Sequence, residues 1–126
     1  MSILGLGADI VNIRRIEEVV SRFGDKFAKR ILCNLEWEKY LINKYPIRFL
    51  AKIFAVKEAA AKAFGTGIGS GITFKNFEVF KDKYGKPYLR CWQNAAMISE
   101  NIGVIRIHIT LTDEKDYVYA LVLIEN

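Results

Sequence analysis

The sequence predicts an α+β protein in which an antiparallel sheet packs against one long helix and several shorter ones. Helical periodicity dominates the segment from residue 12 to 65, whereas apolar and polar residues alternate over much of residues 72–92 and 104–124. The chain has 126 residues, 52% of them hydrophobic, and we see no linker, repeat or low-complexity tract. We therefore expect one domain over residues 1–126, large enough for its own core.

The first third is expected to form a strand followed by two helices. Ile3–Val11 is typical of a strand. Asn12 can cap the helix that follows. The apolar stripe of that helix is expected to continue without a break through Ile13, Ile16, Val20, Phe23, Phe27 and Ile31. A short helix from Leu35 to about Lys44 should come next, capped by Asn34 and with Trp37 and either Tyr40 or Leu41 inward, until Tyr45-Pro46 breaks it.

Asp9 is a lone carboxylate in an otherwise apolar strand. Burying an ionised carboxylate without partners costs several kcal/mol, so Asp9 needs a compensating contact. Backbone N–H groups, a cation or a metal ion could each supply it. From spacing alone, structural pairing is favoured over a metal.

The segment from Phe49 to Gly65 predicts the helix around which the rest of the chain is organised. Lys57 falls in the middle of its apolar stripe, with Glu58 beside it and Lys62 one turn further on. Two cations and one acid would thus gather on a partly buried face. The small side chains of residues 59–61, all alanine, would let a ligand or another element approach closely. The alternative is a solvated Glu58–Lys62 pair of little energetic weight.

Four glycines at alternate positions, 65, 67, 69 and 71, follow this helix together with the hydroxyls of Thr66 and Ser70. Such a segment can turn its N–H groups inward to bind an anion, or it can be a flexible connector. A Walker loop is excluded, because that loop leads from a strand into a helix and has a different spacing.

The C-terminal half reads as strands with one short helix. We expect strands at Ile72–Phe80 and Tyr88–Trp92, a helix at Gln93–Asn101 closed by Gly103, and a hairpin of Val104–Thr112 with Tyr117–Ile124. His108 is the only histidine and shares the polar face of its strand with Arg106 and Thr110. A lone strand histidine is usually a surface residue, but this combination also suits phosphate.

Charge and cysteine content limit the possible classes of function. A net charge of +5 favours an acidic or phosphorylated partner, yet no basic block stands out as a nucleic-acid tail. Basic residues spaced along the first helix, Arg15, Arg22, Lys26 and Lys29, could dock an acidic surface or simply be solvated. Cys33 and Cys91 are typical of reduced, buried thiols in a cytosolic protein. There is neither a recognisable secretion signal nor an apolar run long enough to span a membrane.

Three motifs together are specific: GLGADIV at 5–11, FAVKEAAAKAFGTGIG at 54–69 and HITLTD at 108–113, with GKPYL at 85–89 between them. Over essentially its full length the chain resembles the bacterial holo-acyl-carrier-protein synthases, the small 4'-phosphopantetheinyl transferases. Two departures from the family pattern are Ala8, where threonine is common, and Cys33, where threonine or serine often stands. Neither departure affects a proposed ligand.

The resemblance implies transfer of phosphopantetheine from coenzyme A to a serine of apo acyl carrier protein in the cytoplasm, in support of fatty acid biosynthesis. The reaction would require Mg²⁺ and release adenosine 3',5'-bisphosphate. Asp9 and Glu58 match the metal-binding carboxylates, and hard oxygen ligands suit Mg²⁺. Lys62 would hold the phosphates, and Glu58 or a metal-bound water near it is the candidate base. The remaining coenzyme A contacts would come from Thr66, Gly67, Lys86, Pro87 and His108.

The resemblance also implies macromolecular partners. Arg15, extended by Arg22 and Lys26, would meet the acidic recognition helix of the carrier protein. The family is typically trimeric with each coenzyme A site between two subunits, so His108 could serve a neighbour's metal site. Two alternatives remain: a regulator that binds coenzyme A or a nucleotide without catalysis, and a basic nucleic-acid-binding module. The aromatic residues occupy core stripes, which disfavours the second, and intact Asp9, Glu58 and Lys62 disfavour the first.

Overall fold

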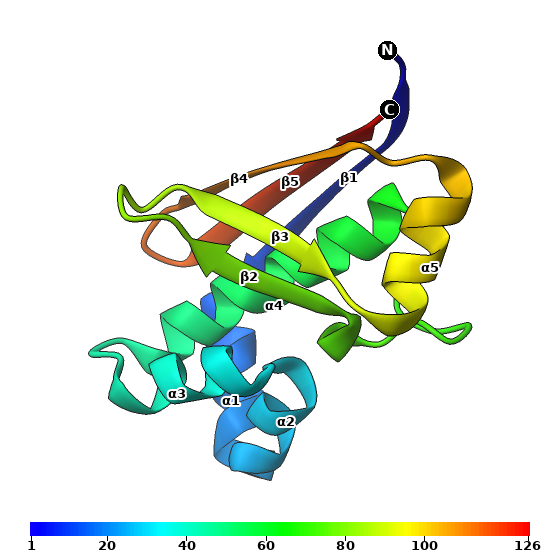
Figure 1. Cartoon of the computed structure of the whole chain (residues 1–126). Helices are drawn as coiled ribbons and strands as arrows, with labels where there is room; N and C mark the ends of the chain where they lie inside the picture. Colours follow the sequence, from blue (N-terminus) through cyan, green and yellow to red (C-terminus); the bar gives the residue numbers. More distant parts are fainter.

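The computed structural model describes residues 1–126 and has three layers with the long helix α4 in the middle (Figure 1). On one side of α4 (Pro46–Ala63) lies the antiparallel sheet β1-β5-β4, and on the other side lies the hairpin β2–β3. The strands are β1 (Ile3–Asn12), β2 (Phe77–Lys81), β3 (Pro87–Cys91), β4 (Arg106–Asp113) and β5 (Tyr117–Glu125). The α+β class and the antiparallel pairing are confirmed.

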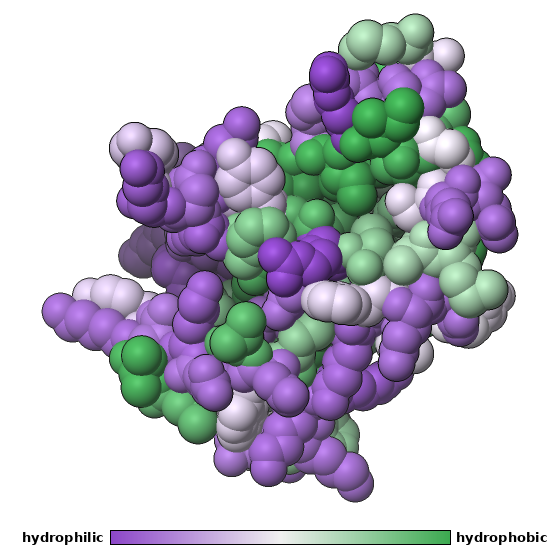
Figure 2. Space-filling view, viewed as in Figure 1, coloured by the Kyte–Doolittle hydropathy of each residue, from purple (hydrophilic) through white to green (hydrophobic).

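The shorter helices gather at two ends of these layers (Figure 1). Beside the first half of α4 lie α1 (Ile13–Phe23), α2 (Asp25–Ile31) and α3 (Asn34–Ile42), while α5 (Gln93–Ile102) lies at the other end. The hydropathy surface follows this division (Figure 2). The end formed by α1, α2 and α3 is mainly hydrophilic in this view, and hydrophobic surface gathers in the opposite half.

Strand β1 and helix α4 approach each other closely because glycine faces alanine. A Cβ atom added to Gly7 would lie 2.0 Å from the Ala59 carbonyl oxygen, and one added to Gly5 would lie 1.9 Å from that of Ala63. Any side chain at either glycine would therefore push the strand off the helix. The expected close approach at the alanine run is confirmed, and the element that approaches is β1.

The first helical segment is two helices, so the prediction of one continuous helix to Ile31 is wrong. Gly24 separates α1 from α2 with φ 61° and ψ −144°, a conformation that interrupts the helix. Phe23, which was expected on the buried stripe, is instead 57% exposed. The cap is confirmed, because the Asn12 side chain accepts a hydrogen bond from the Arg14 amide at 3.0 Å. The break divides the expected basic stripe between two helices.

Helix α3 and the strand after the glycines also begin at other residues than predicted. Asn34 is the first residue of α3, and Cys33 precedes it with its amide bound to Glu36 Oε1 at 2.8 Å. Of the two inward candidates Tyr40 is buried, whereas Leu41 is 60% exposed. The strand expected from Ile72 starts at Phe77, because Phe74–Asn76 forms a short 3₁₀ helix.

Both cysteines are free and half-buried. Burial raises the pKa of the Cys91 thiol to about 11, and it is also the main cause that raises the pKa of Cys33. Both thiols are therefore protonated at neutral pH and poor nucleophiles, although they are less buried than expected. None of the helices has the length and apolar character that crossing a bilayer requires.

Candidate functional site

Asp9 and Lys62 meet where β1 crosses α4. The odd-numbered residues of β1 face the helix, and the close approach at Gly7 places the Asp9 carboxylate beside the next turn of α4. Lys62 Nζ lies 3.1 Å from Asp9 Oδ1 and donates a hydrogen bond to the Ala8 carbonyl oxygen at 3.0 Å. The Asp9 side chain is only 16% exposed. Its charge is thus compensated by a cation, one of the alternatives that its burial required.

Glu58 lies beside this pair without forming a hydrogen bond or an ion pair within the chain. Its pKa is raised, first because partial burial disfavours the charged form and second because Asp9 is a nearby negative charge, while Lys62 lowers it. Two carboxylates therefore share one ammonium group. Such a site gains from an additional cation, which would return the pKa of Glu58 towards or below its ordinary value.

Lys57 does not join this group, contrary to the expectation that both lysines of α4 gather around Glu58. Its side chain is fully buried and points to Glu36 of α3, with Nζ 2.6 Å from Glu36 Oε1. The sequence placed Lys57 correctly on the apolar stripe. It gave no sign that the partner would be Glu36, because that residue lies on a separate short helix.

A pocket of about 490 Å³ lies between β1, α1, α2 and α4 and contains both carboxylates. Arg15 of α1 lines the same pocket as Asp9 and Glu58. Besides Ile10 and Val11 of β1, its apolar wall contains helical side chains that sequence reasoning did not assign to a site, namely Ile16, Val19, Phe27 and Phe54. Ile16, Phe27 and Phe54 were recognisable only as core positions, because helical spacing is the same for a pocket wall and for a packed core, and Val19 was not singled out at all.

The other two basic residues expected on the docking face lie further along the same surface. Lys26 lines an adjoining hollow of about 330 Å³, which shares Val19 and Phe27 with the carboxylate pocket. Arg22 lies at the end of α1, with its guanidinium 6.0 Å from the ring centre of Phe23. The two hollows adjoin at Val19 and Phe27, and at least one basic side chain lines each of them.

The glycine-rich segment caps the C-terminus of α4 with its first amides. The Gly65 amide donates to the Lys62 carbonyl oxygen, and the amides of Thr66 and Gly67 both donate to that of Ala61. Thr66 Oγ1 donates to the Gly67 carbonyl oxygen at 2.9 Å. These three amides are therefore not turned inward for an anion, which corrects that part of the expectation. In the segment from residue 65 to 71, the amides of Ile68, Ser70 and Gly71 make no hydrogen bond within the chain.

Lys86 and Pro87 lie in a different pocket. This hollow of about 430 Å³ opens between the β2–β3 hairpin and β4, over the first half of α4, and also contains Lys52 and Thr110. None of its lining residues lines the carboxylate pocket. Within one chain, the structure therefore does not bring Lys86 and Pro87 together with Asp9 and Glu58.

His108 is also remote from the two carboxylates within one chain. It lies on β4, which β5 separates from β1, and its side chain is 58% exposed. His108 Nε2 is 3.0 Å from Glu125 Oε1, and Arg106 lies 4.0 Å from the same oxygen. Sequence reasoning missed Glu125. The pairing of Arg106 with Glu125 in the β4–β5 register could have indicated it.

No group of three or more His, Cys, Asp and Glu side chains is arranged to hold a metal ion. A divalent cation at Asp9 and Glu58 would have two protein carboxylates, and the rest of its coordination would come from water and substrate oxygens. That donor set suits Mg²⁺, which usually keeps several waters and binds through one or two carboxylates plus phosphates.

Comparisons with known proteins agree on one family. The family model described as "4'-phosphopantetheinyl transferase superfamily" matches residues 5–122. The holo-[acyl-carrier-protein] synthase of Cronobacter sakazakii is 57% identical over 126 residues, which is 100% of both chains. The crystal structure of the Neisseria meningitidis holo-[acyl-carrier-protein] synthase is 38% identical with a TM-score of 0.94, covering 99% of this chain and 100% of the other.

A third relative was solved with a bound ligand. The holo-(acyl-carrier-protein) synthase of Bacillus anthracis, in complex with CoA (3',5'-ADP), is 34% identical with a TM-score of 0.80. The match covers 97% of this chain and 96% of the other. Sequence and fold therefore agree along the whole length, and the chain belongs to the 4'-phosphopantetheinyl transferase superfamily, within its holo-[acyl-carrier-protein] synthase group.

Proposed function

We propose that this chain transfers the 4'-phosphopantetheine arm of coenzyme A to a serine hydroxyl of apo acyl carrier protein and so supports fatty acid biosynthesis. The observation that carries the proposal is the pocket that Asp9, Glu58 and Arg15 line together. Two carboxylates for a metal and one arginine for an acidic partner lie on its facing walls. This arrangement fits a reaction in which a phosphate ester and an acidic protein meet at one point.

In the proposed reaction the serine oxygen forms a bond to the phosphorus atom that carries pantetheine. The bond from that phosphorus to the bridging pyrophosphate oxygen breaks, and adenosine 3',5'-bisphosphate leaves. Asp9 and Glu58 would hold Mg²⁺, which when bound neutralises the charge that develops on the phosphates. Lys62, half-exposed beside Asp9, is placed to bind a phosphate oxygen as a point charge.

Glu58 is the group we propose for the serine proton, which it takes directly or through one water molecule. A general base must be within reach of the proton and have a pKa suited to accepting it. Glu58 borders the pocket and has no hydrogen-bond or ion-pair partner within the chain, so a carboxylate oxygen is free to accept the proton. Asp9 is less suited because Lys62 already compensates its charge.

The coenzyme A contacts proposed for the rest of the chain are narrowed by the geometry. For Thr66 and Gly67, both amides cap α4 and the Thr66 hydroxyl donates to the Gly67 carbonyl oxygen, so a contact of Thr66 with a phosphate would require that hydroxyl to turn away from this partner. Lys86, Pro87 and His108 are proposed to bind coenzyme A held mainly by another copy, because none of the three borders the carboxylate pocket of its own chain.

A homotrimer with sites between subunits is supported by the uncovered face of the sheet β1-β5-β4. On the side away from α4, Leu6 and Ile10 of β1 are 59% and 64% exposed, and Tyr119 of β5 is 40% exposed. His108 lies on the same face, because it pairs with Leu123, which pairs with Leu6. Covering the apolar part of this face with a second copy would also bring His108 to the interface.

We place the protein in the cytoplasm as one transferase domain over residues 1–126, and the two free thiols agree with a reducing compartment. The test is the intact mass of apo acyl carrier protein incubated with this protein and coenzyme A, with and without Mg²⁺. A mass gain of one phosphopantetheine group that requires the metal supports the proposal. Coenzyme A binding without any mass gain would instead support a regulator.

A further inference from the structure

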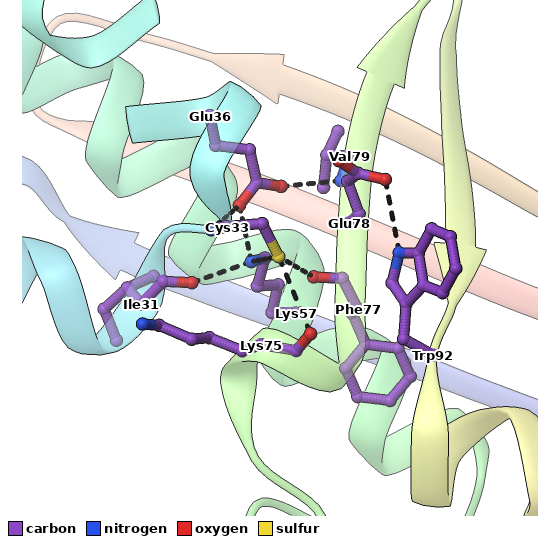
Figure 3. A network of polar contacts seen from close by, with 9 residues as sticks. All are labelled: Ile31, Cys33, Glu36, Lys57, Lys75, Phe77, Glu78, Val79 and Trp92. Carbon is purple, nitrogen blue, oxygen red and sulfur yellow. Dashed lines mark hydrogen bonds and ion pairs between the residues drawn. The ribbon is translucent and has the colours of Figure 1, made fainter. Parts of the chain in front are cut away.

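Lys57 and Glu36 form an ion pair that is completely enclosed by the protein, with side chains that are 0% and 1% exposed (Figure 3). Lys57 Nζ lies 2.6 Å from Glu36 Oε1, donates to the Ile31 carbonyl oxygen at 2.7 Å and contacts Cys33 Sγ at 3.7 Å. These contacts use all three N–H bonds of the ammonium group. Lys57 therefore has no donor left for a substrate.

Glu36 is equally well satisfied. Its Oε1 also accepts the Cys33 amide at 2.8 Å, and its Oε2 accepts the Val79 amide of β2 at 2.7 Å. The Cys33 thiol in turn donates to the Phe77 carbonyl oxygen at 3.3 Å. One pair thus joins the end of α2, the start of α3, the middle of α4 and the free edge of β2, as Figure 3 shows.

Stability alone does not explain such a pair. The desolvation cost of two buried charges can equal or exceed their attraction, and well-packed apolar residues often replace them without loss. A network of directed hydrogen bonds does, however, select one arrangement of the elements that it joins, whereas apolar packing tolerates several. What the pair can contribute here is the placement of α4 against α2, α3 and the edge of β2, with α1 following through its connection to α2 at Gly24.

That placement matters for the carboxylate pocket. Glu58 follows Lys57 directly on α4, and Ile31 ends α2, whose Phe27 lines the same pocket. Arg15 lies on α1, which Gly24 connects to α2. The buried pair therefore joins α4, which carries Glu58, to the end of α2, which carries Phe27 of the opposite wall.

We propose that the Lys57–Glu36 pair is a positioning device that sets the distance and angle between Glu58 and the wall that receives the carrier protein. The proposal rests on the function proposed above. The pair contacts neither substrate and acts only through α4 and the helices packed on it. Without it, the serine of the carrier protein and the phosphate bound at Glu58 are held in a poorer relative geometry.

The decisive variant is the double substitution Glu36→Leu with Lys57→Met, which removes both charges and keeps the volume of the core. We expect lower stability towards unfolding, because the Cys33 and Val79 amides and the Ile31 carbonyl lose their hydrogen-bond partners. Under native conditions we expect unchanged affinity for coenzyme A and a loss of about 10 to 100-fold in kcat/KM for apo acyl carrier protein, the range seen when outer positioning groups are removed. Amide hydrogen exchange in α1, α2 and α3 should become faster.

The matched control is Arg48→Met on the same helix. Arg48 joins the start of α4 to the end of β4 and the turn after it, with 2.7 Å from its Nη1 to Asp113 Oδ2, and its side-chain hydrogen bonds all go to residues 113–115. The Arg48→Met variant should leave amide hydrogen exchange in α1, α2 and α3 unchanged. A double variant with both wild-type exchange and wild-type kcat/KM would overturn the proposal and leave the pair a purely structural one.

Two further measurements keep the test decisive. If the double variant does not fold, Glu36→Gln replaces it. This change puts an NH₂ group in place of the oxygen that accepts the Val79 amide, so that two donors face each other. Unchanged amide hydrogen exchange and unchanged kcat/KM in the Glu36→Gln variant would contradict the proposal. If the wild type forms no holo carrier protein, the proposed function fails, and the exchange experiment still decides whether the pair fixes α4 against the helices.

Discussion

Two lysines of α4, Lys57 and Lys62, each pair with a carboxylate of another element, but the two pairs differ in burial and in distance. Lys57–Glu36 is enclosed, with 2.6 Å between Nζ and Oε1, while Lys62–Asp9 has 3.1 Å between Nζ and Oδ1 and a lysine that is 50% exposed. In the enclosed pair, the three N–H bonds of Lys57 and both carboxylate oxygens of Glu36 have hydrogen-bond partners. The open pair has an unpaired carboxylate beside it. Environment, and not residue type, separates the enclosed pair from the pair that we propose to bind substrate.

Glu58→Gln should produce the largest effect on transfer. The amide cannot hold a divalent cation as a carboxylate does, and it cannot accept the serine proton. We expect kcat/KM to fall by about 1000-fold or more, which corresponds to several kcal/mol of lost transition-state stabilisation. The check is the rate of holo acyl carrier protein formation, followed by mass. Turnover near the wild-type rate would refute the assignment of Glu58.

The same variant should keep or slightly gain stability at neutral pH. A raised pKa of Glu58 means that the folded state binds its proton more tightly than the unfolded state does. That contribution to stability is complete below the unfolded pKa and is lost as pH rises through the folded pKa. Replacing Glu58 by glutamine removes this loss, so thermal unfolding at pH 7 should occur at the same or a higher temperature.

Exchanging the two lysines for methionine should separate stability from activity. Lys57→Met leaves Glu36 as a buried unpaired charge and should cost about 3–5 kcal/mol of unfolding free energy. Lys62→Met removes a half-exposed pair and should cost at most about 1 kcal/mol, while it lowers kcat/KM for transfer. Denaturant unfolding of the two variants measures the difference. Equal losses of stability would contradict the contrast between the pairs.

The acid side of the pH–rate profile should depend on the concentration of Mg²⁺. The proton and the metal compete for Glu58, whose pKa is raised by burial and by Asp9. At low Mg²⁺ the rate should therefore begin to fall at a higher pH than an ordinary glutamate would predict. Raising Mg²⁺ should move this limb to lower pH, because the metal displaces the proton. An acid limb that stays fixed at all Mg²⁺ concentrations would argue against Glu58 as a ligand.

Local patterns predicted the elements well because they depend on nearby residues. The strand of Asp9, the Asn12 cap, the alanine face of α4 and the hairpin of β4 and β5 all follow from spacing within a few residues. The break at Gly24 was missed because the apolar stripe continues across it in the sequence. The helix is interrupted only by the backbone conformation at Gly24, which the apolar spacing does not reveal.

The site was predictable in part for the same reason. Glu58 and Lys62 lie one turn apart on one helix, so their proximity follows from the sequence, but the contact of Lys62 with Asp9 joins residues 53 positions apart. The use of the Thr66 and Gly67 amides as a helix cap depends on the turn after α4, which glycine leaves undetermined. Glu36, the partner of Lys57, was hidden because a glutamate on a short helix is usually exposed.

The smallest expected effect concerns salt and the outer wall of the carboxylate pocket. Arg15 forms no ion pair within the chain, so its attraction to an acidic carrier protein acts through solvent and is screened at high ionic strength. Raising salt from low to physiological concentration should increase KM for the carrier protein more than KM for coenzyme A. Arg15→Gln should weaken this salt dependence, whereas Arg48→Gln, whose partner is Asp113 of the same chain, should leave it unchanged. A carrier-protein KM that does not depend on ionic strength would show that the basic side chains of α1 and α2 do not receive the partner, although it would not contradict the reaction that we propose at Asp9 and Glu58.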